Sequence, residues 1–144
     1  MRRLLSDDSF CPVNLGAAHD LMVRASAGMV CSGTATLEAA LFGLPMVILY
    51  RTAWLTWVVG RRLVQVPFLG MPNLLAGREI AREFLQDDAR PDRIAAEMLR
   101  LSGDPEARNS LQRELASAVS KLGESGAGTR AATAILRELS TASP

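Results

Sequence analysis

The feature that most constrains the fold is a strand, a helix and a second strand joined by very short turns. Residues 28–31 form a short strand-like segment, Ser32-Gly33 is a turn of small residues, and residues 34–42 have the composition of a helix. Gly43-Leu44-Pro45 stops that helix, and the unbroken apolar run Met46–Tyr50 follows. Such a run is typical of a parallel strand covered on both faces. The sequence therefore predicts a right-handed βαβ unit, whose ligands bind at the carboxyl ends of the strands.

The turn between the first strand and the helix has the character of an anion site. The first N–H groups of a helix lack intrahelical partners, so they can bind phosphate. Glu38 lies one turn further on and is the only charged residue between Arg24 and Arg51. With Thr34 as the predicted N-cap, Glu38 falls one position beyond the capping-box carboxylate. Its oxygens can accept hydrogen bonds from a ribose diol, and the structural alternative is stabilisation of the helix dipole.

Composition narrows the class of protein. A chain of 144 residues with 49% hydrophobic residues is one domain in size, and a net charge of +1 argues against a nucleic-acid partner. Cys11 and Cys31 have no His or Cys cluster beside them, so we expect no metal site, no disulfide and a cytoplasmic location. Residues 1–10 do not resemble a signal peptide, and charges interrupt the apolar stretch 46–69 before it could span a membrane.

The rest of the chain predicts one further strand and several helices. We expect a short strand at 13–15, helices over 17–25 and 53–66, a loop at 71–73, a helical stretch that ends near Gln86, and helices over 92–101, 106–122 and 129–139. The predicted units are an incomplete Rossmann-like domain at 1–90 and a helical carboxyl-terminal segment at 91–144 that packs on it. The fold class is α/β, a partial three-layer α/β/α parallel sheet with a helical tail.

Together, several short motifs resemble the carboxyl-terminal half of lipid-A-disaccharide synthase, over roughly residues 17–139. The motifs, in this order and spacing, are Ser32–Glu38, Pro45-Met46-Val47 with Tyr50-Arg51, Pro72–Glu79, and Leu85-Gln86. The first is shared loosely by many glycosyltransferases of the two-Rossmann (GT-B) architecture. The combination with the Pro-Asn-Leu-Leu-Ala-Gly-Arg segment is specific to this family.

The resemblance implies a reaction and a division of labour. The family joins UDP-2,3-diacylglucosamine to 2,3-diacylglucosamine 1-phosphate and releases UDP, with no metal and no cofactor expected. The carboxyl-terminal half holds the UDP-sugar donor, whereas the amino-terminal domain supplies the acceptor pocket and the general base. We therefore expect no catalytic residue in this chain, no turnover by the chain alone, and a need for the missing domain or a partner chain. The acylated substrates imply a membrane surface, at the inner membrane.

The resemblance also assigns residues to the donor. The implied substrate-binding residues are Ser32, Gly33, Thr34, Thr36, Glu38, Arg51, Asn73 and Arg78. The first three would meet the diphosphate, with Thr36 close behind them, and Glu38 would meet the ribose. Arg51 would meet phosphate or sugar, Asn73 a sugar hydroxyl or the uracil edge, and Arg78 phosphate. The structural alternatives are a surface salt bridge for Arg51, loop capping for Asn73 and a solvated arginine for Arg78. His19 receives no role.

Two further surfaces follow from the sequence. An incomplete sheet has an open edge, so we expect a partner chain or a homo-oligomer. The apolar residues Trp54, Trp57 and Phe68 with Arg61 and Arg62 are interpreted as core packing with a solvated edge, the alternative being a membrane-facing surface. The competing functions are another UDP-sugar GT-B enzyme, such as a related epimerase, and a non-catalytic remnant or interaction module with the same fold.

Overall fold

The computed structural model describes residues 16–53, 66–123 and 126–141. Its elements in chain order are α1 (Ala18–Arg24), β1 (Gly28–Cys31), α2 (Thr34–Leu41), β2 (Met46–Tyr50), α4 (Met71–Ala76), β3 (Glu83–Leu85), the 3-10 turn η2 (Gln86–Asp88), α5 (Pro91–Gly103), α6 (Pro105–Ser120) and α7 (Ala127–Thr141). Among the described helices, none combines the length and the apolar composition that a membrane crossing needs.

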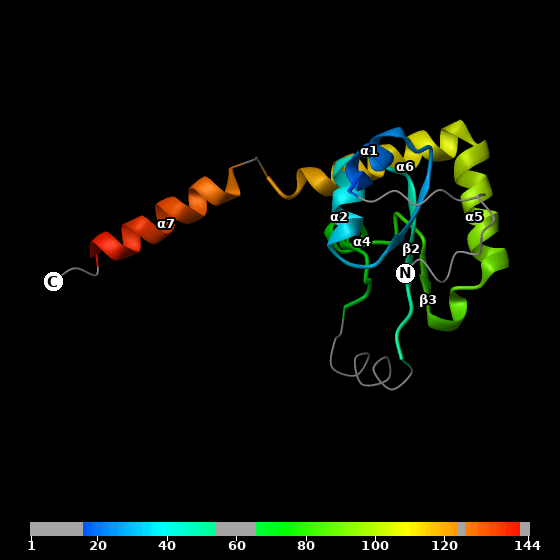
Figure 1. Cartoon of the computed structure of the whole chain (residues 1–144), viewed down its shortest axis with the longest axis horizontal. Helices are drawn as coiled ribbons and strands as arrows, with labels where there is room; N and C mark the ends of the chain where they lie inside the picture. Colours follow the sequence, from blue (N-terminus) through cyan, green and yellow to red (C-terminus); the bar gives the residue numbers. More distant parts are fainter. Residues whose placement is uncertain (1–15, 54–65, 124–125, 142–144) are drawn as a thin grey trace.

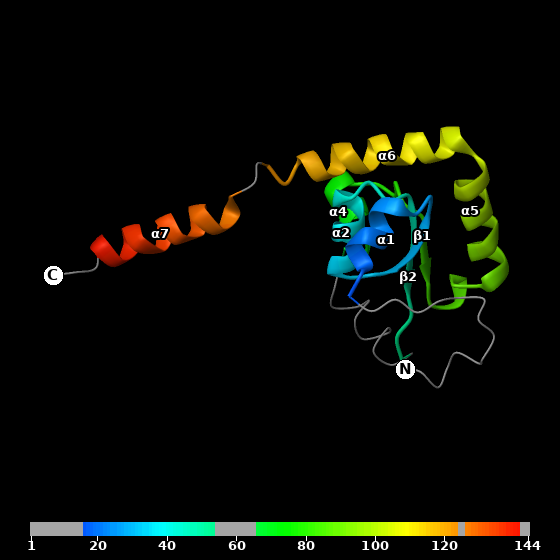
Figure 2. The same cartoon turned by 45° about the horizontal axis from the view of Figure 1, so that its top comes forward.

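The described strands form a parallel sheet in the order β1-β2-β3. Gly28 pairs with Met46 at one end of the first ladder, and Tyr50 pairs with Leu85 at the end of the second. Helices α2 and α4 lie on one side of the sheet, α5 lies on the other, and α6 crosses one end (Figures 1 and 2). This arrangement confirms the α/β class and the βαβ unit.

The core forms where β2 meets the helices on both faces. Met46, Val47 and Ile48 are fully buried. This two-sided burial explains why β2 contains no charged residue. The side chains that pack on the strands come from α2, β3, α5 and α6, and include Ala39, Ala40, Phe84, Leu101, Leu111 and Leu115.

The region between β2 and α5 corrects the sequence predictions. Residues 71–73, expected in a loop, begin α4, and the segment expected to be helical up to Gln86 contains β3. The helix α4 ends at Gly77, whose φ of +74° lets its N–H bond to the Asn73 carbonyl at 2.9 Å. Beyond it, Phe84 is buried beside β2, so sheet pairing decides the structure of this segment.

The carboxyl-terminal helices follow the prediction closely. Proline begins both α5 and α6, as the pattern indicated. Helix α5 contacts β2, and α6 contacts α2, α4 and α5. Helix α7 extends away from the sheet, and its Ile135, Leu136 and Leu139 are exposed (Figure 1). The domain boundary after residue 90 stays a prediction.

Some predictions fall where the structure makes no assignment. The strand at 13–15, Cys11, and the helix over 53–66 except for its first and last residues lie outside the described residues. The same holds for Trp54, Trp57, Arg61 and Arg62.

Candidate functional site

The turn between β1 and α2 is held at the carboxyl edge of the sheet. The Ser32 N–H donates to the Leu49 carbonyl of β2 at 2.8 Å, so the turn begins directly beside the neighbouring strand. Gly33, and not the predicted Thr34, is the N-cap of α2, and its φ of +142° is a conformation that side chains with a Cβ rarely adopt. No side chain caps this helix, and its first turn carries no acidic residue. The N-terminus of α2 is therefore a suitable position for an anion.

The hydroxyls of this turn face the segment Leu69–Met71. Ser32 Oγ donates to the Leu69 carbonyl at 2.9 Å. Thr36 Oγ1 donates to the Gly33 carbonyl at 2.7 Å and accepts from the Met71 N–H at 3.3 Å, and Thr36 is fully buried. The expected contact of Thr36 with phosphate is thus not supported, because its hydroxyl is used within the chain. Gly33 and Thr34 are the exposed residues of the turn.

Glu38 has a partner on α1. Its Oε2 lies 3.1 Å from Nε2 of His19, to which the sequence assigned no role. The His19 ring also packs against Phe42, with 5.1 Å between the ring centroids. The Glu38 side chain is still 46% exposed. A carboxylate that is half open to solvent beyond the N-terminus of α2 can accept a ligand's hydroxyls.

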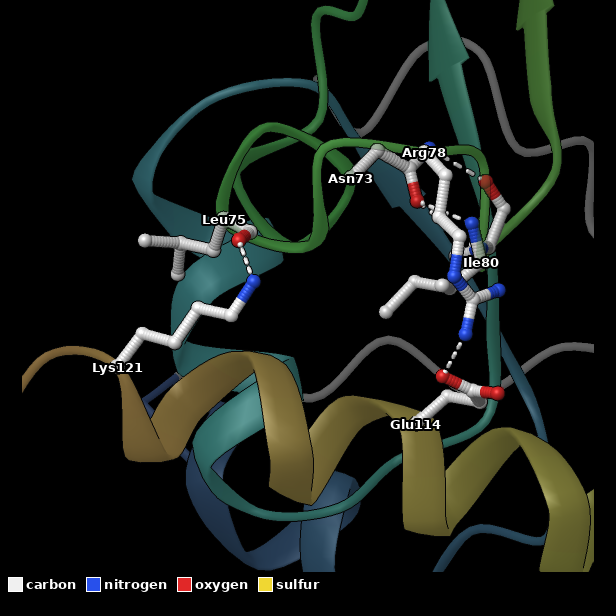
Figure 3. Close-up of polar contacts among 7 residues, drawn as sticks. Asn73, Leu75, Arg78, Ile80, Glu114 and Lys121 are labelled. Atoms are coloured by element: carbon white, nitrogen blue, oxygen red, sulfur yellow. Dashed lines mark hydrogen bonds and ion pairs between the residues drawn. The ribbon is translucent and has the colours of Figure 1, made fainter.

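Asn73 is buried, and its amide is used inside the protein. Nδ2 donates to the Ala81 carbonyl at 2.7 Å and to Glu83 Oε1 at 2.9 Å. Oδ1 accepts from the N–H groups of Ile80 and Ala81 at 2.9 Å each, and Figure 3 shows Asn73 beside Ile80. The structural alternative of loop capping therefore describes Asn73. Its contact with a sugar or with uracil is not supported, because its donor and acceptor atoms already have partners.

Arg78 lies toward the amino ends of the strands, whereas the β1–α2 turn lies at their carboxyl ends. It forms an ion pair with Glu114 of α6, which raises the pKa of Arg78 and lowers that of Glu114 (Figure 3). In α6, Gln112 Nε2 donates to the carbonyl of Gly43, which precedes β2, so α6 lies at the amino end of the strands. Arg78 borders an open groove of about 460 Å³ together with residues of α5 and α6. Its predicted contact with phosphate is thus not supported.

Arg51 keeps its predicted position. It directly follows β2 and is exposed. The next residue, Thr52, is fixed by Gln86: the Thr52 N–H donates to Oε1 at 2.9 Å, and Nε2 donates to the Thr52 carbonyl at 3.0 Å. Gln86 has a φ of +48°. Its side-chain amide continues the β2–β3 pairing by one step, and so fixes the backbone beside Arg51.

Sequence reasoning missed Glu83, which organises the segment beside the turn. Its carboxylate accepts from the Leu69 and Gly70 N–H groups at 2.9 Å each, and from Asn73 Nδ2. The backbone donors lie 14 and 13 residues earlier in the chain. No motif spacing specifies such a contact, because backbone amides are present at every non-proline residue.

Comparison with known proteins identifies the family. The family model described as "Lipid-A-disaccharide synthetase" matches residues 11–136. The lipid-A-disaccharide synthase of Syntrophus aciditrophicus is 44% identical over 121 residues, which is 84% of this chain and 32% of that protein. The enzymes of the same name from Anaeromyxobacter dehalogenans and Koribacter versatilis are 43% and 46% identical, over 84% and 69% of the chain and 32% and 26% of their own lengths.

The residues that the family model matches include the β1–α2 turn. The chain spans about a third of the length of the relatives it matches. The family model covers most of its residues, and the identities exceed 40%. The chain belongs to the lipid-A-disaccharide synthase family.

Proposed function

We propose that this chain is the donor-binding portion of a lipid-A-disaccharide synthase, and that it binds the nucleotide of UDP-2,3-diacylglucosamine. The observation that carries the proposal is the uncapped N-terminus of α2 behind Gly33, with the half-exposed carboxylate of Glu38 one turn further on. A helix N-terminus favours a diphosphate, and a carboxylate accepts from two vicinal hydroxyls. A nucleoside diphosphate offers both groups.

In this proposal the exposed residues of the turn meet the ligand. The backbone N–H groups at Gly33 and Thr34 bind the diphosphate, and Glu38 binds the ribose diol. Arg51, exposed at the end of the neighbouring strand, contacts phosphate or sugar. Ser32, Thr36 and Asn73 support the site from behind, since their side chains bond within the chain.

The complete reaction needs groups that we assign to the rest of the protein. We expect the acceptor, 2,3-diacylglucosamine 1-phosphate, and the general base that deprotonates its hydroxyl to be held by a domain outside this sequence. The chain spans only about a third of its relatives, which supports this division. The chain alone therefore has no transferase activity, and because both substrates carry acyl chains, the complete enzyme works at the inner-membrane surface from the cytoplasmic side.

Calorimetric titration of the 144-residue chain with UDP tests the donor site. Wild type should bind, and Glu38→Ala should weaken binding by about 1.5–3 kcal/mol, as the loss of charge-assisted hydrogen bonds does. A 2′-deoxyuridine diphosphate should bind wild type more weakly than UDP does, and should lose less affinity on Glu38→Ala than UDP does, because only its 3′-hydroxyl remains to donate to Glu38. Glu106→Ala, which removes an exposed carboxylate from the first turn of α6, is the matched control.

The outcomes separate the competing functions. Equal affinities of wild type and Glu38→Ala would remove Glu38 from the site. No UDP binding at all would favour a non-catalytic module with this fold. Binding of several unrelated UDP-sugars in preference to UDP-2,3-diacylglucosamine would favour another glycosyltransferase or an epimerase.

A complementation assay tests the incompleteness of the chain. The purified chain, incubated with both lipid substrates, should form no disaccharide detectable by mass spectrometry. Addition of the separately expressed amino-terminal part of the Syntrophus aciditrophicus relative should restore product, because proton transfer by a general base typically contributes about 10² to 10⁴ in rate. Robust product formation by the chain alone would refute this part of the proposal.

A further inference from the structure

We propose that Glu83 is a positioning residue for the nucleotide-binding turn, and that it acts through the segment Leu69–Met71. This inference rests on the proposed function, because it concerns the same turn. Glu83 lies on β3, two strands away from β1, and so cannot contact a ligand at the turn directly without crossing β2. Its influence must pass through the chain that lies between them.

The first step is the contact between Glu83 and the segment. Oε2 accepts from the Leu69 N–H at 2.9 Å, and Oε1 accepts from the Gly70 N–H and from Asn73 Nδ2 at 2.9 Å each. Glu83 is half-buried. Hydrogen bonds to an ionised carboxylate are stronger than those between neutral groups, so one side chain fixes two consecutive peptide units and the start of α4.

The second step joins the segment to the turn. Ser32 Oγ donates to the Leu69 carbonyl at 2.9 Å, and the Met71 N–H donates to Thr36 Oγ1. Thr36 Oγ1 in turn donates to the carbonyl of Gly33, the N-cap. Leu69 is therefore held on one side by Glu83 and on the other by Ser32, so a shift of the segment moves the turn.

The third step is the close packing of Gly70 against β2, which leaves the segment Leu69–Met71 no room to shift. A Cβ placed on Gly70 would lie 2.3 Å from Ile48 Cδ1 and 3.1 Å from Glu83 Oε1. The segment thus rests directly on the buried side chain of β2 while its amides face the carboxylate. A segment fitted this tightly transmits displacement instead of absorbing it.

Variants of Glu83 and UDP affinity test the inference. Glu83→Ala should lower UDP affinity about tenfold, the lower end of the effect that the loss of a supporting hydrogen-bond partner has at metal sites. Glu83→Gln should lose less, because its Oε1 retains the Gly70 and Asn73 donors while its NH₂ group faces the Leu69 N–H. Glu79→Ala is the matched control: its Oε1 accepts from the Glu83 N–H at 2.9 Å and does not touch the segment, so UDP affinity should stay unchanged.

A double-mutant cycle separates positioning from general stability. If Glu83 acts through Leu69 and Ser32, the effects of Glu83→Ala and Ser32→Ala on UDP affinity should be markedly less than additive. Additive effects in variants that unfold at the same urea concentration as their parents would overturn the proposed route.

Amide hydrogen exchange without ligand gives a second readout, independent of UDP binding. In Glu83→Ala, exchange should accelerate by about tenfold at Leu69 and Gly70, which lose their acceptor, and also at Met71 and Thr36, which do not contact Glu83. Acceleration confined to Leu69 and Gly70 would overturn the inference.

If wild type fails to bind UDP while this exchange pattern is observed, the proposed function fails and the positioning role stands. Should Glu83→Ala not fold, the same measurements on Glu83→Gln decide, with a smaller acceleration at the same four amides.

Discussion

Gly70 occupies a position where even one added methyl group meets a buried side chain. The Ile48 Cδ1 atom would lie 2.3 Å from the new Cβ, far inside van der Waals contact. We predict that Gly70→Ala lowers the free energy of unfolding by about 1–3 kcal/mol, the usual cost of overpacking. Gly103→Ala, at the end of α5 with open space around the Cβ position, is the control and should be neutral or slightly stabilising. Urea denaturation of both variants measures the difference.

Asn73 lies beside the candidate site and uses its side-chain amide for hydrogen bonds within the chain. Asn73→Ala leaves the Ile80 and Ala81 N–H groups and the Ala81 carbonyl without their side-chain partners. We predict a loss of about 2–4 kcal/mol in unfolding free energy, measured by urea denaturation, because buried polar groups without partners carry their full desolvation cost. Asn109→Ala, an exposed asparagine on α6, should change stability little. A stable Asn73→Ala variant with normal urea midpoint and lost UDP binding would instead restore Asn73 to the ligand contacts.

At the scale of elements, α6 depends on its N-cap residue, Asp104. The side chain of Asp104 accepts from the N–H groups of Glu106 and Ala107 at 2.9 and 3.1 Å, and so caps the helix that packs Leu111 and Leu115 into the core. We predict that Asp104→Ala destabilises the protein by about 1 kcal/mol, whereas Asp104→Asn, which retains a capping oxygen, costs much less. Thermal unfolding followed by circular dichroism compares the two. Equal losses would show that the negative charge matters more than the cap.

Helix α5 carries an ion pair between Glu97 and Arg100. The hydrogen bond from Arg100 lowers the pKa of Glu97 below its ordinary value of 4.5. A lowered folded-state pKa means that the pair stabilises the protein above about pH 4.5 and that this contribution is lost as the pH falls through the lowered value. Because Arg100 is half exposed, Glu97→Gln should cost only about 0.3–0.5 kcal/mol at pH 7, and the difference from wild type should shrink as the pH is lowered from 7 through the lowered pKa of Glu97. A difference that stays constant over this pH range would contradict the assignment.

Elements with a single strong local signal were predictable from the sequence. The unbroken apolar run Met46–Tyr50 indicates a strand that is buried on both faces. The prolines at 91 and 105 mark the starts of α5 and α6. The segment before Gln86 was misread because Ile80 and Phe84 have the spacing of a helix face, and pairing with a distant strand overrides that period. Loop capping by Asn73 was among the sequence alternatives, whereas the hydrogen bonds of Glu83 to Leu69 and Gly70 could not be predicted, because they join residues that only the folded chain brings together.

At the scale of the whole molecule, β1 is a terminal strand among those described. Met29 of this strand is 60% exposed, and one row of its backbone groups faces away from β2. We predict that the isolated chain self-associates, with a molar mass by light scattering that rises with concentration. Met29→Lys should reduce this association, since charge on an edge strand disfavours pairing. A monomer at every concentration would show that the chain covers this edge by itself.

The contact between Glu83 and Leu69 also has a kinetic consequence. Glu83 lies on β3, which pairs with β2, and the contact of Ser32 with Leu69 spans 37 residues of sequence. We therefore expect these contacts to close after the sheet has assembled, and the β1–α2 turn to acquire its final shape late in folding. Substitutions at Glu83 should therefore speed unfolding while leaving the folding rate almost unchanged, as interactions absent from the transition state do. On this expectation, the hydrophobic core forms before the turn has the shape that the proposed nucleotide needs.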